Sequence, residues 1–298
     1  MNDRPATLGD RLFVALQYLL PQHLLSRLLG RLAHARLAPL KNALIRRFIT
    51  RFGVDMSEAA EPDPAAYPHF NAFFTRALRP GARTVDAASD ALVSPADGAV
   101  SQIGSIEAGR IFQAKGHAFS AAELLADSTD AALFDGGAFA TIYLSPRDYH
   151  CVHMPLDARL RTLRHVPGRL FSVNAVTAAA VPALFARNER VVCVFDTAHG
   201  PLAMVLVGAM VVAGIETVWT GPVAPAGHGV LTIDYERDAR ERTLAKGAEM
   251  GRVQLGSTVI LLLPRGRVSW DPALRAGSAL RMGQRIATLP GQAAERFP

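Results

Sequence analysis

Four residues in this 298-residue chain have side chains suited to nucleophilic or acid–base chemistry. Ser257 follows Gly256 in the phrase LGST and stands directly before the apolar run TVILLLP. His150 and His153 lie three residues apart in YHCVHMP, and Asp97 occupies the turn SPADGAV. A hydroxyl, an imidazole and a carboxylate are the parts of a serine triad, which is defined by geometry and not by order in the chain. Asp97, His153 and Ser257 are therefore one candidate triad.

The same residues also have plainer interpretations. An aspartate before a glycine usually forms a turn with its own side chain. A spacing of three places two histidines on one face of a helical turn but on opposite faces of a strand. No HExxH pattern and no closely spaced cysteine pair occurs, so we predict no metal site. Ser257 is not part of a GxSxG phrase, so the nucleophile elbow of the α/β-hydrolases is absent.

The elements that must position these residues are mostly strands. From about residue 91 onward, short apolar runs alternate with glycine-containing turns, a pattern typical of a β core. Only residues 174–188 and the phrase SAAELLAD suggest helices inside this core. The turns in SPADGAV and LRMGQRIATL resemble those of barrel-sandwich folds. We therefore predict an α+β protein with a mainly β, barrel-sandwich-like core and amphipathic helices at its N-terminus.

The net positive charge of the chain comes from its N-terminal end. Residues 1–52 hold nine Lys or Arg and two Asp, whereas the rest of the chain holds 23 basic and 24 acidic residues. Leucines recur at helical spacing here beside arginines such as Arg27 and Arg31, as in a helix at a membrane surface or one packed on its own core. No run of about 18 apolar residues predicts a membrane-spanning helix. No secretory signal is evident. The basic residues alternate with leucines and lack aromatic residues positioned to stack on bases, which disfavours a nucleic-acid partner.

The composition around residues 53–70 marks a boundary, because this stretch is rich in proline and acidic residues. We expect a helical, membrane-associating segment over residues 1–60 and a catalytic domain over residues 61–298. Cys151 and Cys193 lack the spacing and number of a disulfide framework, so we interpret them as reduced thiols in a cytosolic setting.

Five phrases, in this order, resemble the phosphatidylserine decarboxylase family in its bacterial, membrane-associated form: SPADGAV, QAKGHAFSAAELL, YLSPRDYHCVHMP, PGRLFSVN and KGAEMGRVQLGSTVILLLP. The resemblance extends from about residue 61 to residue 290. Phe119 and Ala121 stand where the family more often has Tyr and Leu, and neither difference affects a residue expected in the site.

The resemblance implies a precursor that cuts itself between Gly256 and Ser257 into a large chain, 1–256, and a small chain, 257–298. The Ser257 hydroxyl attacks the Gly256 carbonyl, with His153 as the base and Asp97 orienting it. The resulting ester then eliminates to leave a dehydroalanine at position 257, and this residue takes up water and loses ammonia to become a covalent pyruvoyl group. This group is the cofactor that the resemblance implies.

The resemblance further implies decarboxylation of phosphatidylserine to phosphatidylethanolamine and CO2, through a Schiff base between the pyruvoyl group and the substrate amine. His150 is a candidate for protonating the carbanion or contacting the head group, and Ser172 is a weaker candidate for the same pocket. The expected partners are phosphatidylserine in the membrane and a second copy in a homodimer of cut protomers. The expected location is peripheral, on the cytoplasmic face of the bacterial cell membrane.

Two other functions compete with this one. A non-enzymatic barrel-sandwich carrier would need an exposed lysine between methionines, but Lys246 lies between an alanine and a glycine. A serine hydrolase would use Asp97, His153 and Ser257 while leaving the chain intact. An uncut, unmodified chain that acts on lipid would favour the hydrolase.

Overall fold

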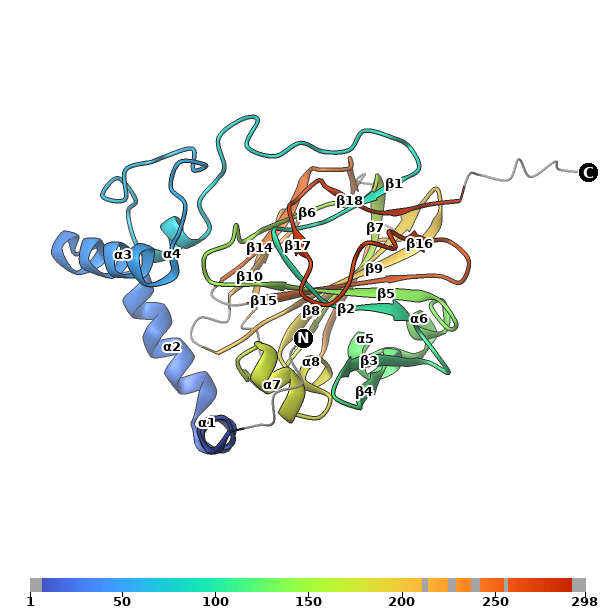
Figure 1. The fold of residues 1–298 in the computed structure, drawn as a ribbon, viewed down its shortest axis with the longest axis horizontal. Coiled ribbons are helices and arrows are strands. Elements are labelled where there is room, and N and C mark those ends of the chain that lie inside the picture. Colours follow the sequence, from blue (N-terminus) through green and yellow to red (C-terminus); the bar gives the residue numbers. More distant parts are fainter. Residues whose placement is uncertain (1–6, 211–213, 225–228, 237–241, 255–256, 291–298) are drawn as a thin grey trace, which may run out of the picture.

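A computed structural model gives the structure of residues 7–210, 214–224, 229–236, 242–254 and 257–290 (Figure 1). The helices are α1 (Leu8–Leu19), α2 (Gln22–Ala33), α3 (Ala38–Phe52), α4 (Phe70–Phe74), α5 (Ala121–Leu125), α6 (Ser128–Ala132), α7 (Ala175–Ala180) and α8 (Leu184–Arg187). The first nine strands are β1 (Ala91–Val93), β2 (Gly98–Ser105), β3 (Arg110–Ala114), β4 (His117–Ser120), β5 (Ala138–Leu144), β6 (Cys151–His153), β7 (Ala158–Val166), β8 (Arg190–Thr197) and β9 (Gly200–Val207). The others are β10 (Ile215–Thr217), β11 (Gly221–Ala224), β12 (Leu231–Asp234), β13 (Thr243–Leu244), β14 (Glu249–Val253), β15 (Ser257–Leu263), β16 (Ser269–Trp270), β17 (Ala279–Leu280) and β18 (Arg285–Thr288).

The strands form one large sheet and three smaller ones. The large sheet has the order β12-β7-β8-β9-β15-β5-β2-β17, with β13 also paired to β7. The smaller sheets are β11-β10-β14-β6, β1-β18-β16 and β3-β4. The paired strands are antiparallel, so the α+β class is as predicted. Within the described ranges no sheet closes into a barrel, and the barrel-sandwich-like character stays a prediction.

Strand β15 lies at the centre of the large sheet and is buried on both faces, as its continuous apolar run predicts. Val259 and Leu261 point into a core shared with Val152, Met154 and other residues of the β6–β14 sheet. Ile260 and Leu262 belong to a second core, which also contains side chains of α5, α7 and α8. The alternation follows from the two-residue period of a strand. The small sheet and the helices therefore cover opposite faces of β15.

The N-terminal helices form a separate group at one side of the molecule (Figure 1). α1 begins with a capping box between Thr7 and Asp10, and α3 ends at Gly53 in a left-handed conformation. α3 packs on α4 through an aromatic cluster that includes Phe48 and Phe73. None of the helices in the described part of the chain is long and apolar enough to cross a membrane.

Candidate active site

The large sheet brings the start of β15 level with the Asp97 turn. Strand β5 lies between β15 and β2, with Ser257 opposite Leu144 and Ala99 opposite Tyr143. Neighbouring strands are about 4.8 Å apart, so the two outer backbones are roughly 10 Å apart at this level. Gly256 lies outside the described residues, and only the backbone of Ser257 is described.

Strands β6 and β14 bring both histidines to the same region. β6 pairs antiparallel with β14, whose last residue is Val253, shortly before β15 begins. The backbone N–H of Val253 donates to the carbonyl of His150 at 3.1 Å. The backbone N–H of His153 donates to the carbonyl of Pro95 at 2.8 Å, two residues before Asp97. The histidines therefore lie between the Asp97 turn and the end of β14.

His153 has the properties of a neutral base. Its Nδ1 lies 2.8 Å from the carbonyl of Gly247, and its Nε2 lies 3.0 Å from the hydroxyl of Tyr149. Because a carbonyl only accepts, Nδ1 carries the proton and Nε2 accepts from the Tyr149 hydroxyl. Burial lowers the pKa of His153, so the imidazole is neutral near pH 7. A buried, neutral imidazole suits general-base catalysis once Tyr149 releases the Nε2 lone pair.

Asp97 has a different partner from the one the triad would give it. Its carboxylate accepts from Arg83 Nε at 2.9 Å, from Arg83 Nη2, and from the backbone N–H of Met282 at 2.8 Å. The Nδ1 proton of His153 goes instead to the Gly247 carbonyl. Asp97 acts on His153 through its charge, which raises the pKa of that histidine against the larger effect of burial. Direct orientation of His153 by Asp97 stays a prediction.

Four residues of this arrangement are not among the predicted site residues: Arg83, Tyr149, Gly247 and Met282. Tyr149 adjoins His150 in the YHCVH phrase, so its proximity to the histidines was open to inference. Arg83 and Gly247 carry no local pattern that links them to Asp97 or His153. Their contacts depend on the tertiary fold.

His150 is fully buried and packs against the ring of Phe74, with 4.1 Å between ring centroids. Its Nδ1 lies 2.8 Å from the carbonyl of Asp148, so Nδ1 carries the proton. Its Nε2 has no hydrogen-bond partner among the described residues. Burial lowers the pKa of His150 to about 3, and the positive charge of Arg76 acts in the same direction. His150 is therefore neutral and offers an unused acceptor.

Ser172 lies apart from the two histidines. Its hydroxyl donates to Gln17 Oε1 of α1 at 3.0 Å. Its neighbours Phe171 and Val173 belong to the core under α7, whereas Val152 beside His153 belongs to the core on the other face of the sheet. The structure thus gives Ser172 a place at the contact between α1 and the segment before α7.

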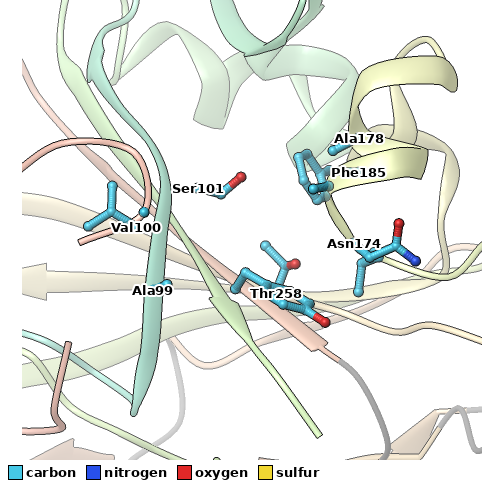
Figure 2. A pocket seen from close by; sticks show the side chains of 11 residues that line it. Ala99, Val100, Ser101, Asn174, Ala178, Phe185 and Thr258 are labelled. Carbon is cyan, nitrogen blue, oxygen red and sulfur yellow. The ribbon is translucent and has the colours of Figure 1, made fainter. Parts of the chain in front are cut away.

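A small cavity of about 180 Å³ opens beside the start of β15. Figure 2 shows Thr258 at its floor, with Ser101 on one side and Asn174 and Phe185 on the other. Its lining is mainly apolar and comes from β2, β5, β15 and the α7 region. His150, His153 and Asp97 do not line it. The cavity and the histidines therefore approach β15 from different sides.

Other chemistry has less support in the described part of the chain. No three His, Cys, Asp or Glu side chains there converge as metal ligands. Cys151 and Cys193 are buried and unpaired, in line with the prediction of reduced thiols. Burial raises the pKa of Cys151 to about 12, which keeps the thiol protonated and unreactive.

The site thus combines a neutral buried base, a charged Arg–Asp pair and a second neutral histidine next to the connection between two sheets. Comparisons with known proteins identify the class. A family model described as phosphatidylserine decarboxylase matches residues 70–288, and a second model described as PSD matches residues 12–53. The chain belongs to the phosphatidylserine decarboxylase family, as the sequence phrases predicted.

The similar proteins are alike over nearly their full lengths. The phosphatidylserine decarboxylase proenzyme of Stutzerimonas stutzeri (strain A1501) is 60% identical over 96% of this chain and 95% of its own. The proenzyme of the same name from Bordetella pertussis (strain Tohama I) is 58% identical, over 97% of this chain and 98% of its own. That of Pseudomonas putida (strain KT2440) is 60% identical, over 95% and 99%.

Proposed function

We propose that the chain cuts itself between Gly256 and Ser257 and then decarboxylates phosphatidylserine to phosphatidylethanolamine and CO2, as a carboxy-lyase. Membership of the family supports the reaction. The observation that carries the site is the neutral, buried His153 on β6, beside the strand that leads into the Gly256–Ser257 bond. At this position His153 can act as the base that deprotonates Ser257, a nucleophile of the same chain.

In the proposed self-cut, Nε2 of His153 takes the proton of the Ser257 hydroxyl, after Tyr149 gives up its hydrogen bond to that nitrogen. The hydroxyl oxygen bonds to the Gly256 carbonyl carbon, and the peptide bond breaks as His153 returns the proton to the nitrogen of Ser257. An ester has replaced the amide. Loss of the Ser257 α-proton then expels the Gly256 carboxylate and separates chains 1–256 and 257–298.

Asp97 supports this chemistry electrostatically. Because Arg83 and the Met282 N–H hold its carboxylate, Asp97 presents a fixed negative charge. That charge favours the imidazolium that His153 becomes during the proton transfer. Asp97 thereby stabilises a charge that develops only in the reaction, whether or not it later forms a hydrogen bond with His153.

The residues around His150 fit a small prosthetic group at position 257. The unused Nε2 of His150 is a buried acceptor that needs a polar partner. A pyruvoyl group formed from Ser257 supplies a ketone that holds the substrate amine and accepts the electron pair left by departing CO2. The free Nε2 of His150 can accept a hydrogen bond from the substrate ammonium, and His150 is the candidate for delivering a proton to the carbon that has lost CO2. Ser172 remains a weaker candidate for binding the substrate.

The N-terminal helices support attachment to a membrane, because some of their polar side chains are buried while several of their leucines are exposed. Gln17 and Gln22 are buried and bond to the segment 170–172, whereas Leu8, Leu12 and Leu19 are 84%, 69% and 82% exposed. Exposed leucines beside many arginines suit insertion to headgroup depth in an anionic membrane. We therefore assign residues 1–60 to membrane association and residues 61–298 to catalysis, with the protein peripheral on the cytoplasmic face.

A matched pair of variants tests the membrane assignment. Serine at Leu8, Leu12 and Leu19 should reduce sedimentation with anionic vesicles at least tenfold. Serine at Val218, Val230 and Leu231, which are also exposed, removes three apolar side chains elsewhere and should leave sedimentation unchanged. Undiminished binding by the first variant, or by a chain lacking residues 1–52, would refute the assignment.

The proposed reaction is tested by intact mass and by CO2 release from labelled phosphatidylserine. The protein should consist of two chains on a denaturing gel, and chain 257–298 should have the mass of a pyruvoyl end, blocked to Edman sequencing. Ser257→Ala should be neither cut nor active. A single chain with an unmodified serine that still decarboxylates the lipid would refute the proposal.

The proposal includes a homodimer of cut protomers, measurable by light scattering, and the barrel-sandwich-like character of the core. Short strands joined by glycine turns at β1, β16, β17 and β18 support the latter.

A further inference from the structure

Arg76 is a buried cation without an ion-pair partner among the described residues. The residue is only 4% exposed and follows α4. Its Nη2 donates to the carbonyl of Arg147 at 3.2 Å, and its guanidinium lies 5.5 Å from the ring centre of Phe73. Its Nε and Nη1 are buried and find no hydrogen-bond partner in the part of the chain that the structure describes. A buried charge without a paired anion is costly, which favours binding of an anionic ligand at Arg76.

Arg76 lies beside the proposed active site. Phe74, two residues earlier, packs on His150, and the carbonyl of Thr75 lies 3.8 Å from the Cys151 sulfur. The charge of Arg76 contributes to the low pKa of His150. The segment with Arg76 therefore contacts the segment with His150. Each carries buried nitrogen atoms without a described partner: Nε and Nη1 of Arg76, and Nε2 of His150.

Asn71 links this region to the proposed cut. Its Oδ1 is also buried and has no partner among the residues described, and its Nδ2 donates to Gln254 Oε1 at 3.1 Å. Gln254 lies two residues before Gly256. A cut after Gly256 would create a new chain end two residues beyond Gln254. We therefore expect the region around Asn71 and Arg76 to accept an anion in the cut protein.

We propose that Arg76 binds the phosphodiester of the lipid substrate and so positions the amine near residue 257. This inference rests on the proposed function. The substrate carries two oxyanions, and their fates differ. The carboxylate loses its charge as CO2 departs, so a buried guanidinium bound to it would stabilise the ground state more than the transition state. The phosphodiester keeps its charge throughout, and holding it lowers the barrier by orientation alone.

The test uses capture of amines on the cut protein by cyanoborohydride, read as the mass of chain 257–298. Dihexanoylphosphatidylethanolamine has the phosphodiester but no carboxylate, and L-serine has the carboxylate but no phosphodiester. Calorimetric titration of the same short-chain lipid without reductant gives a second readout. The variants are Arg76→Gln, Arg76→Lys, and Arg147→Gln as a control that removes the same charge from an exposed side chain nearby.

Losing a charge-assisted hydrogen bond costs about 1.5 to 3 kcal/mol, or roughly ten- to hundredfold in affinity. Arg76→Gln should therefore weaken lipid capture and binding at least tenfold and leave L-serine capture within twofold of the unmodified protein. Arg76→Lys should restore part of the loss, and Arg147→Gln should change neither.

Three results would overturn the inference. Weaker L-serine capture with unchanged lipid capture would assign Arg76 to the carboxylate. Unchanged capture of both probes would make the guanidinium purely structural. If Arg76→Gln does not fold, a folded Arg76→Lys protein with normal lipid affinity would likewise show that the guanidinium does not bind the phosphodiester. If the unmodified protein is not cut and captures nothing, the proposed function itself fails, which is a distinct outcome.

Discussion

Arg83 should be the side chain on which the charge at Asp97 most depends. Its side chain is 6% exposed, that of Asp97 is 10% exposed, and the two meet through Nε at 2.9 Å and 3.2 Å and through Nη2. Hydrogen bonding to Asp97 raises the pKa of Arg83, so the guanidinium stays charged at any working pH. Arg83→Met would leave a buried carboxylate with one remaining described donor, the N–H of Met282.

Removing one partner of a buried pair costs about 3 to 5 kcal/mol, because the other charge stays in a poorly solvated place. The retained Met282 bond puts the expected loss for Arg83→Met near the lower end, about 3 kcal/mol. Adding Asp97→Asn removes the stranded charge and should restore at least about 1.5 kcal/mol of the free energy of unfolding. Both variants are made in the Ser257→Ala background, so that every sample is the same uncut chain.

The assay is urea unfolding followed by circular dichroism, with the slope of the transition checked for constancy. Arg281→Met is the matched control. Both arginines pair with Glu58, Arg83 at 2.7 Å and Arg281 at 3.2 Å, but the side chain of Arg281 is 68% exposed. Surface pairs contribute little, so this control should lose less than about 1 kcal/mol. A loss below 1 kcal/mol for Arg83→Met, or additive losses in the double variant, would refute the reasoning.

Two further predictions concern stability, measured by the same unfolding assay on the uncut chain. A Cβ at Gly98 would lie 2.3 Å from the carbonyl oxygen of Tyr143, so Gly98→Ala should cost about 3 kcal/mol. Gly109→Ala, whose Cβ would meet nothing within 4 Å, should cost about 1 to 2 kcal/mol, and equal losses would disprove the steric account. The folded pKa of His150, about 3, lies below its unfolded value, so stability should be full above about pH 6.5 and fall by about 1.4 kcal/mol per pH unit below it. His150→Gln should reduce the difference between pH 7.5 and 5.5 by at least 1 kcal/mol, and an unchanged difference would contradict the assigned pKa.

Much of the fold could be predicted from local patterns. The run TVILLLP predicts a strand buried on both faces. β15 is such a strand, because it lies between β9 and β5 and one core covers each of its faces. The leucine periodicity near the N-terminus predicts helices, and α1 to α3 are present. Periodicity reports an apolar face but not what covers it, so it could not predict that Gln17 and Gln22 would be buried while leucines are exposed.

The partners of the site residues could not be predicted in the same way. His153 takes its Nδ1 partner from Gly247, 94 positions away, and Asp97 takes one of its donors from Met282, 185 positions away. Such contacts depend on how β6, β14 and the chain before β18 pack, and no side-chain pattern encodes a backbone carbonyl as an acceptor. The resemblance of the sequence phrases predicts which residues react, and those roles stay predictions. The structure adds what holds two of them.

The position of the proposed cut explains how a chain can be broken there without coming apart. β14 belongs to the sheet with β6 and β10, whereas β15 lies between β9 and β5 in the large sheet. The bond between residues 256 and 257 therefore joins two sheets that are each paired independently. Chain 257–298 would keep β15 in the core and would still pair β17 with β2 and β18 with β1. Burial of five apolar side chains of β15 alone contributes on the order of 10 kcal/mol to retention. The two chains should therefore separate only when the protein unfolds. The proposed cut would create a new chain end near the histidines while the strands that hold them stay paired.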